Sequence, residues 1–254
     1  MIDCLRIASQ LRRRAARGFT LIELMVSIAI ALFLIGGALT IVGRTRSTFA
    51  AQNQLSQLQD NERLAMTFMA EVIESGGYFP TPKLYTAAGV MPATGVFAAP
   101  GQAVYGTSTG AGDTVTIRFG AGLGDNVYGC TGASNGAVGP YDTYVNYFWV
   151  NTAVVAPQLP QLMCTFTNNA GTLPAVPLVN GVTQLTILYG VKRNPAVALS
   201  CTDTYLNANQ MLAADWLNVC SIVVNAFFSN PLNALQPIKI QRVIAVMTSA
   251  GVNP

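Results

Sequence analysis

The chain passes from a basic N-terminal stretch into an uninterrupted apolar one. Residues 24–43 include no charged side chain over 20 positions. As an α-helix rising about 1.5 Å per residue, this stretch would cross the roughly 30 Å hydrocarbon core of a bilayer. We therefore expect residues 19–43 to form a transmembrane helix.

A second helical pattern follows without a break. Its apolar side chains recur at steps of three and four residues with polar side chains between them, at Leu55, Leu58, Ala65, Phe68, Met69, Val72 and Ile73. This spacing is typical of an amphipathic helix. Gly76 and Gly77, with Pro80 shortly after, predict where the helix ends. We expect residues 44–77 to form this helix and to bury its apolar stripe on a globular domain.

The remaining residues, 78–254, favour strands. From Pro80 to Asp113 small residues and proline dominate without a helical period, which predicts a long surface connection with one short strand near Val104. Segments rich in Val, Ile, Thr, Tyr and Phe then predict strands at Thr114–Phe119, Tyr144–Val150, Gln161–Thr167, Thr183–Val191, Asn218–Phe228 and Ile238–Thr248. One long helix followed by strands predicts an α+β fold, with the helix packed on an antiparallel β-sheet head domain.

The charges are distributed unevenly around the apolar segment. The formal net charge is +3, but residues 1–18 hold five arginines and one aspartate, so the rest of the chain is at −1. This basic excess before the segment predicts a cytoplasmic N-terminus and an exported head, although Arg44 and Arg46 follow the span. No basic patch with interleaved aromatic residues occurs in the remainder, so we expect no nucleic-acid partner.

Cysteine usage agrees with export. Cys4 lies in the basic stretch, whereas Cys130, Cys164, Cys201 and Cys220 lie in the expected head. An even count in an exported domain predicts two disulfides. Sequential pairing, Cys130–Cys164 and Cys201–Cys220, closes the shorter loops and is preferred among three connectivities, while four buried free thiols are the alternative.

The start of the apolar segment carries a specific motif. An ordinary secretory signal has a shorter apolar core and a cleavage site beyond it. Here the residues Arg17-Gly18-Phe19-Thr20-Leu21-Ile22-Glu23-Leu24-Met25 resemble the class III signal of type IV prepilins and pseudopilins. The resemblance implies a leader of residues 1–18, cleavage after Gly18 by a prepilin peptidase, and N-methylation of Phe19.

Glu23 has a physical interpretation apart from the resemblance. An ionised carboxylate near the start of a membrane helix is costly and is usually paired and functional. The amine that cleavage would create at Phe19 is a candidate partner, and the resemblance implies that Glu23 of one subunit neutralises this amine on its neighbour during assembly. The alternative is a carboxylate that snorkels to the interface.

Two further segments resemble the PilW-like minor pilins. They are Leu58–Ala65 (LQDNERLA) and Leu178–Val191, which contains Asn180-Gly181 and Tyr189-Gly190-Val191. Lys192-Arg193 departs from that pattern, in which acidic residues are more usual at this point. The resemblance implies a minor pilin that lies in the inner membrane before assembly and in an extracellular fibre afterwards, where it primes assembly. Its implied partners are other pilins and minor pilins, the prepilin peptidase and the inner-membrane assembly platform.

Two other classes of protein compete with this interpretation. A minor pseudopilin of a type II secretion system shares all of the N-terminal chemistry. A membrane-tethered enzyme or adhesin is the more distant alternative.

The sequence offers no catalytic residues and predicts no cofactor. There is no histidine, so the G-x-S-x-G strings at Gly106–Gly110 and Gly132–Gly136 are interpreted as turns, not as nucleophile elbows. Gly120–Gly124 lacks the lysine of a phosphate loop, and the cysteines lack C-x-x-C spacing, so neither a nucleotide nor a zinc site is predicted. Only a calcium site formed by residues distant in sequence stays open.

Overall fold

The structure is a computed structural model that describes residues 18–110, 112–122, 124–133, 139–155, 157–194, 201–233 and 235–247. The chain divides into two compact units, the first ending at Gln52 and the second beginning at Asn53. The helix α1 (Leu21–Glu74) belongs to both units. Residues 1–17 of the expected leader lie outside the described part of the chain.

In the first unit, the apolar half of α1 exposes its side chains along its whole length. Between Leu21 and Val42 it presents exposed Leu, Ile, Val, Phe and Met residues that no other described residue of the unit covers. Within the described residues, α1 is the single helix that is long and apolar enough to cross a membrane. The length and the apolar surface both suit lipid or a bundle of similar helices.

In the second unit, the other half of α1 is part of the head. Residues of the expected stripe, including Ala65, Met69 and Ile73, are fully buried in the core together with side chains from the strands. The helix ends at Glu74, and Gly77 follows with a φ of 82° while its N–H donates to Arg118 O at 2.9 Å. Glycine tolerates this left-handed conformation, so the predicted stop signal works as expected.

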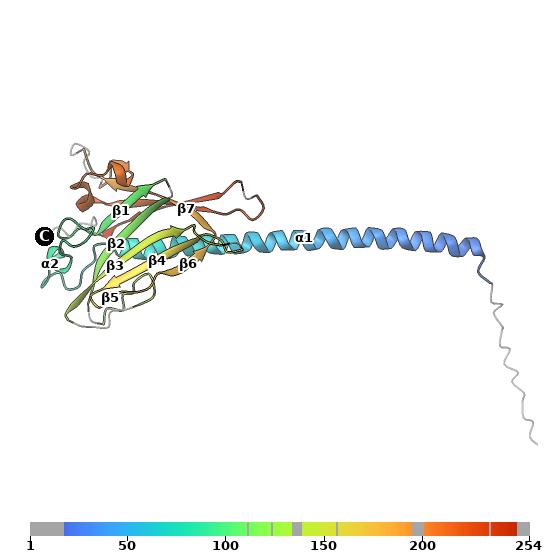
Figure 1. The fold of residues 1–254 in the computed structure, drawn as a ribbon, viewed down its shortest axis with the longest axis horizontal. Helices are drawn as coiled ribbons and strands as arrows, with labels where there is room; N and C mark the ends of the chain where they lie inside the picture. Colours follow the sequence, from blue (N-terminus) through green and yellow to red (C-terminus); the bar gives the residue numbers. More distant parts are fainter. Residues whose placement is uncertain are drawn as a thin grey trace, which may run out of the picture. The chain divides into compact units, whose positions relative to one another are not determined.

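Two antiparallel sheets make up the rest of the head (Figure 1). The first sheet has the order β1-β2-β3-β4-β5, with β6 also paired to β4; its strands are β1 (Val104–Thr109), β2 (Gly112–Gly122), β3 (Tyr141–Asn151), β4 (Gln161–Asn168), β5 (Gly171–Thr172) and β6 (Val176–Asn180). The second has the order β10-β9-β7-β8, with β7 (Val182–Val191), β8 (Thr204–Leu206), β9 (Ser221–Phe228) and β10 (Ile238–Ala245). The predicted fold, a long N-terminal helix on antiparallel β-structure, is confirmed.

A buried carboxylate joins the two sheets. Asp113 of β2 accepts hydrogen bonds from Ser108 Oγ at 2.7 Å and from the backbone N–H of Ile187 in β7 at 2.6 Å. Tyr189 of β7 donates its hydroxyl to Thr114 O at 3.2 Å and stacks edge-on against Trp216. Since the polar groups here are paired, the sheets can pack closely without an uncompensated charge.

The predicted surface connection before β2 is wrong in one respect. This segment contains α2 (Ala87–Val90), and Val90, Met91 and Phe97 are buried. Arg118 of β2 explains why: its buried guanidinium donates to three carbonyl oxygens of the segment, those of Gln102 at 2.7 and 3.0 Å, Pro92 at 2.6 Å and Met91 at 3.2 Å. Its Cζ also lies 4.1 Å from the centre of the Phe97 ring, and burial lowers the pKa of Arg118 to about 10.

Other differences are local. The strands β5, β6 and β8 were not predicted, and Asn218 ends a short 3₁₀ helix, η2 (Asp215–Asn218), ahead of β9. The string Gly106–Gly110 begins inside β1 and is not a simple turn, and Gly120–Gly122 closes β2. The predicted string Gly132–Gly136 and the end of the predicted strand at Thr248 lie partly outside the described residues.

Candidate assembly site

The expected processing site precedes α1 in an open position. Gly18 and Phe19 are exposed, with Phe19 retaining 75% of its accessible surface. A Cβ placed on Gly18 would meet no atom within 4 Å, and the φ of Gly18 is not in the left-handed region. Nothing in the described part of this unit, residues 18–52, therefore requires a glycine at position 18.

Thr20 caps the start of α1. Its hydroxyl oxygen accepts a hydrogen bond from the Glu23 N–H at 3.3 Å, and its carbonyl oxygen accepts one from the Leu24 N–H at 3.2 Å. Thr20 and Glu23 thus have the spacing of a capping box, in which a threonine is followed three residues later by a glutamate. This spacing is a helix-start signal that the sequence analysis overlooked.

The Glu23 side chain has no partner within the part of the chain that the structure describes. It is exposed in the first turn of α1, and no described side chain hydrogen-bonds or ion-pairs with its carboxylate. A carboxylate is favoured at a helix N-terminus, where unpaired N–H groups carry partial positive charge. It is nevertheless a single full charge at the beginning of a long apolar surface, and it is free to bind a cation.

Two regions that were singled out on sequence grounds contact each other. Asn61 of the Leu58–Ala65 segment donates through Nδ2 to Asn180 O at 3.3 Å, at the turn between β6 and β7. Gly181 occupies that turn with a φ of 89°, and its N–H donates to Pro160 O while its carbonyl oxygen accepts from Ser229 N–H. The turn thereby joins α1 to the ends of β4, β7 and β9.

The four head cysteines are paired in the structure. Cys130 is bonded to Cys164 with a Cα–Cα distance of 6.3 Å, and Cys201 to Cys220 with 5.9 Å. Cys164 is fully buried in β4, so the first bond lies in the core. The second closes a loop that begins just before β8 and ends at the start of β9.

These bonds predict a measurable loss of stability on removal. In the chain-entropy account, a closed loop of 34 residues contributes about 4 kcal/mol and one of 19 residues about 3 kcal/mol. Replacing both cysteines of either pair with serine should lower the free energy of unfolding by about these amounts, as measured by urea denaturation. Alkylation of the unreduced, denatured protein should label none of the four head cysteines, and a labelled head cysteine would contradict the pairing.

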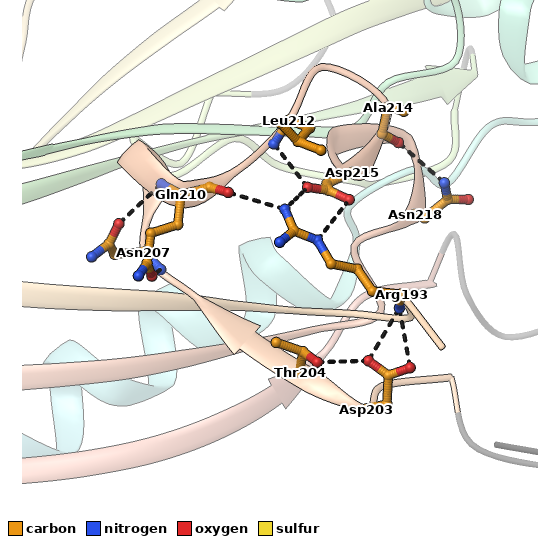
Figure 2. A network of polar contacts seen from close by, with 9 residues as sticks. All are labelled: Arg193, Asp203, Thr204, Asn207, Gln210, Leu212, Ala214, Asp215 and Asn218. Atoms are coloured by element: carbon orange, nitrogen blue, oxygen red, sulfur yellow. Dashed lines mark hydrogen bonds and ion pairs between the residues drawn. The ribbon is translucent and has the colours of Figure 1, made fainter. Parts of the chain in front are cut away.

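A polar network centred on Arg193 includes residues of the loop that the second disulfide closes (Figure 2). Asp203 accepts from the backbone N–H groups of Arg193 at 3.1 Å and Asn194 at 2.6 Å, and from Thr204 Oγ1 at 2.8 Å. These hydrogen bonds from Arg193, Asn194 and Thr204 hold the pKa of Asp203 below its usual value. The network fixes the chain after β7 against the disulfide-closed loop.

The Arg193 guanidinium pairs with Asp215 in the same network. It also donates to Gln210 O at 3.0 Å, and Asp215 accepts from Leu212 N–H at 2.8 Å. The hydrogen bond from Arg193 lowers the pKa of Asp215, and Asp215 in turn raises that of Arg193. The basic residue that departs from the usual family pattern therefore has an acidic partner supplied by this chain's own loop.

No metal centre accompanies these groups. Across the described residues, no cluster of three or more His, Cys, Asp or Glu side chains has the geometry to hold a metal ion. The acidic residues instead accept hydrogen bonds from backbone and arginine N–H groups, as at Asp203 and Asp215.

Comparison with known proteins agrees with the N-terminal motif and with the head. Residues 13–39 match the prokaryotic N-terminal methylation motif, and residues 147–237 match type IV pilus-assembly protein W. Over these two segments, the chain is similar to PilW-like type IV prepilins. No curated protein matches it. Among solved structures, a type IV-like pilin from Thermus thermophilus is similar with a TM-score of 0.41 and 14% identity, over 76% of this chain and 96% of that chain.

The two matches cover different parts of the chain. The methylation motif covers Gly18, Phe19, Glu23 and most of the apolar helix. The pilus-assembly match runs from within β3 to just before β10, and so takes in the β6–β7 turn and the disulfide-closed loop.

Proposed function

We propose that this chain is a minor subunit of a type IV pilus that is processed after Gly18, methylated at Phe19 and incorporated into the fibre, where it primes assembly. The observation that carries the proposal is that one chain contains both the methylation motif and the pilus-assembly match. A methylation motif opens a charge-free membrane-length helix, and the same helix continues into a head with a pilus-assembly match. The domains are then the leader 1–18, the fibre-core helix 19–43, the amphipathic helix 44–77 and the head 78–254.

The openness of Gly18 supports a role in processing. Because the described residues leave room for a side chain there, the glycine is not needed for local structure, and it suits a peptidase that accepts only a small residue before its cut. Cleavage would place a new amine at Phe19, one turn before the free carboxylate of Glu23. Glu23 then serves as the acceptor for the Phe19 amine of a neighbouring subunit.

The exposed apolar half of α1 supports the two proposed locations. Before assembly, the inner membrane covers it as a single-pass helix with a cytoplasmic N-terminus. Afterwards, the helices of other pilins and minor pilins cover it in the extracellular fibre. The prepilin peptidase and the inner-membrane assembly platform act between these two states.

Processing is tested by replacing Gly18. Gly18→Glu should leave the full-length precursor in the inner membrane, because a large charged residue replaces the small one before the cut, whereas Gly18→Ala should still be cleaved. Mass analysis of membrane-extracted protein should find a wild-type chain that begins at N-methylated Phe19. A mature start beyond Ala50 would instead indicate an ordinary secretory signal.

The pilus is distinguished from a secretion system by deletion of the gene. Loss of surface pili with normal protein secretion supports the proposal. Loss of secretion with normal pili would indicate a pseudopilin instead.

A further inference from the structure

The outermost strand of the second sheet, β10, has a backbone edge that no described strand pairs with. It pairs with β9 on one side and stands at the end of the sheet order. Beyond the β9–β10 register, Val246 N–H donates to Cys220 O at 2.9 Å. Hydrogen-bonded pairs alternate along an antiparallel ladder, so Ile240, Arg242 and their even-numbered neighbours bond to β9.

The odd-numbered residues of β10 consequently turn their N–H and C=O groups outward. These are Lys239, Gln241 and Val243, whose side chains are all exposed, Val243 by 58%. None of the described residues hydrogen-bonds to these outward backbone groups. An edge of this length is a template for a further strand.

A groove runs beside this edge. It has a volume of about 290 Å³ and is lined from α1 by Gln59, Glu62, Arg63 and Met66 and from β10 by Ile240, Gln241 and Arg242. One carboxylate oxygen of Glu62 is enclosed there without a hydrogen-bond partner among the described residues, and burial raises the pKa of Glu62. The groove therefore has room for a side chain of an added strand and an acceptor for a donor on that side chain.

The charges at the edge have the opposite sign to the head. From Asn53 onward the chain holds seven basic and nine acidic residues, a balance of −2. Three of the seven cations, Arg63, Lys239 and Arg242, lie on or beside β10, and β10 itself carries no acidic residue. Arg118 is buried and Arg193 is paired, so three of the five remaining cations lie at this edge, the other two being Lys83 and Lys192.

We propose that the β10 edge binds an extended, acidic segment of a partner protein by adding it to the second sheet as a further strand. The backbone edge supplies hydrogen bonds, Lys239 and Arg242 select for acidic side chains, and the groove receives one polar side chain. A second copy of this chain is disfavoured because two β10 strands would bring four cations together. The inference goes beyond the fibre role and concerns the head whether or not the chain assembles.

The test uses the full mature chain in nonionic detergent and synthetic peptides as probes. The acidic probe alternates Glu with Val and Thr over eight residues, and its basic twin has Lys in place of each Glu. Fluorescence anisotropy at low salt should show at least fivefold tighter binding of the acidic probe, since each exposed ion pair is worth about a factor of two to five. Amide hydrogen exchange over residues 238–245 should slow when the acidic probe binds.

Two variants at one position separate backbone pairing from side-chain contact. Gln241→Pro removes an outward N–H and should weaken binding of the acidic probe at least tenfold. Gln241→Ala removes the same side chain and its contact with the groove but keeps the N–H, so it should weaken binding less, by about threefold at most. Thermal melting verifies that the proline variant is folded. If it is not, Lys239→Glu decides, because it should weaken the acidic probe and strengthen the basic one.

Three results would overturn the inference. They are equal binding of the two probes, equal effects of Gln241→Pro and Gln241→Ala in folded proteins, and unchanged amide exchange at saturating acidic probe. Self-association of the chain that Gln241→Pro abolishes would also overturn it, because the edge would then pair with a second copy.

Discussion

Glu23→Ala should abolish recovery of this subunit in sheared fibres while leaving its processing intact. The Glu23 carboxylate is free in the described structure, and loss of its charge would leave the Phe19 amine of a neighbour uncompensated in an apolar fibre core, at a cost of a few kcal/mol per contact. Cleavage should persist because Gly18 is unchanged. Insertion should persist because the segment becomes more apolar and its arginine asymmetry stays. Immunoblots of fibre and inner-membrane fractions measure both.

The capping geometry identifies a matched control for this variant. The cap is a hydrogen bond from the backbone N–H of Glu23 to Thr20 Oγ1 and does not involve the Glu23 side chain, so Glu23→Ala keeps it. Thr20→Val removes the cap and keeps the carboxylate, and its product should still enter fibres. Recovery of the Glu23→Ala protein in fibres at wild-type stoichiometry would eliminate an essential pairing role for this residue.

Arg118→Leu should cause the largest loss of head stability of any single exchange of a charged residue, about 3–5 kcal/mol. The carbonyl oxygens of Gln102 and Pro92 would lose their donor, and each unsatisfied group costs about 1–3 kcal/mol, whereas Met91 O keeps the hydrogen bond from Gly101 N–H. The segment that carries α2 would lose its main attachment to β2. Urea denaturation followed by tryptophan fluorescence measures the change, with Trp216 buried in the core as a reporter.

Two other substitutions test whether the stability loss of Arg118→Leu comes from its hydrogen bonds to the carbonyl groups. Arg63→Leu removes an exposed arginine of α1 and should change stability by less than about 0.5 kcal/mol. Arg118→Lys keeps the charge but gives up the planar fork that reaches several carbonyls, so its loss should be intermediate. Equal stability of Arg118→Leu and the parent would show that water or side-chain rearrangement satisfies the carbonyl groups.

The parts of the fold that were predictable are those in which a periodic pattern decides burial. The stripe through Ala65, Met69 and Ile73 predicted the buried face of α1, and the β-rich segments predicted β2, β3, β4, β7, β9 and β10 to within a few residues. Period and composition suffice there because a helix or strand with one apolar face must bury it.

The parts that were missed depend on single long-range contacts. The segment around α2 has no apolar period, and it is buried because one arginine, 16 to 27 positions away along the chain, satisfies its carbonyl groups. The short strands β5 and β8 pair over only two and three residues, too few for a pattern to show. At the candidate assembly site, the motif predicted Gly18, Phe19 and Glu23 as the residues of interest. The motif could not show that the Glu23 carboxylate has no partner among the described residues.

The burial of the second half of α1 has a mechanical consequence. The helix that we propose as the anchor is continuous from Leu21 to Glu74, and its second half is one wall of the hydrophobic core, through Met69, Ile73 and their neighbours. A pull along the helix axis therefore acts in shear on all of these core contacts, so many of them must break at once. The hydrogen bond from Asn61 to Asn180 O, at the β6–β7 turn, resists sideways movement of the helix. Tension on an anchored subunit would act on the contacts between α1 and the sheets. We expect the head to unfold under force when α1 slides along the sheets.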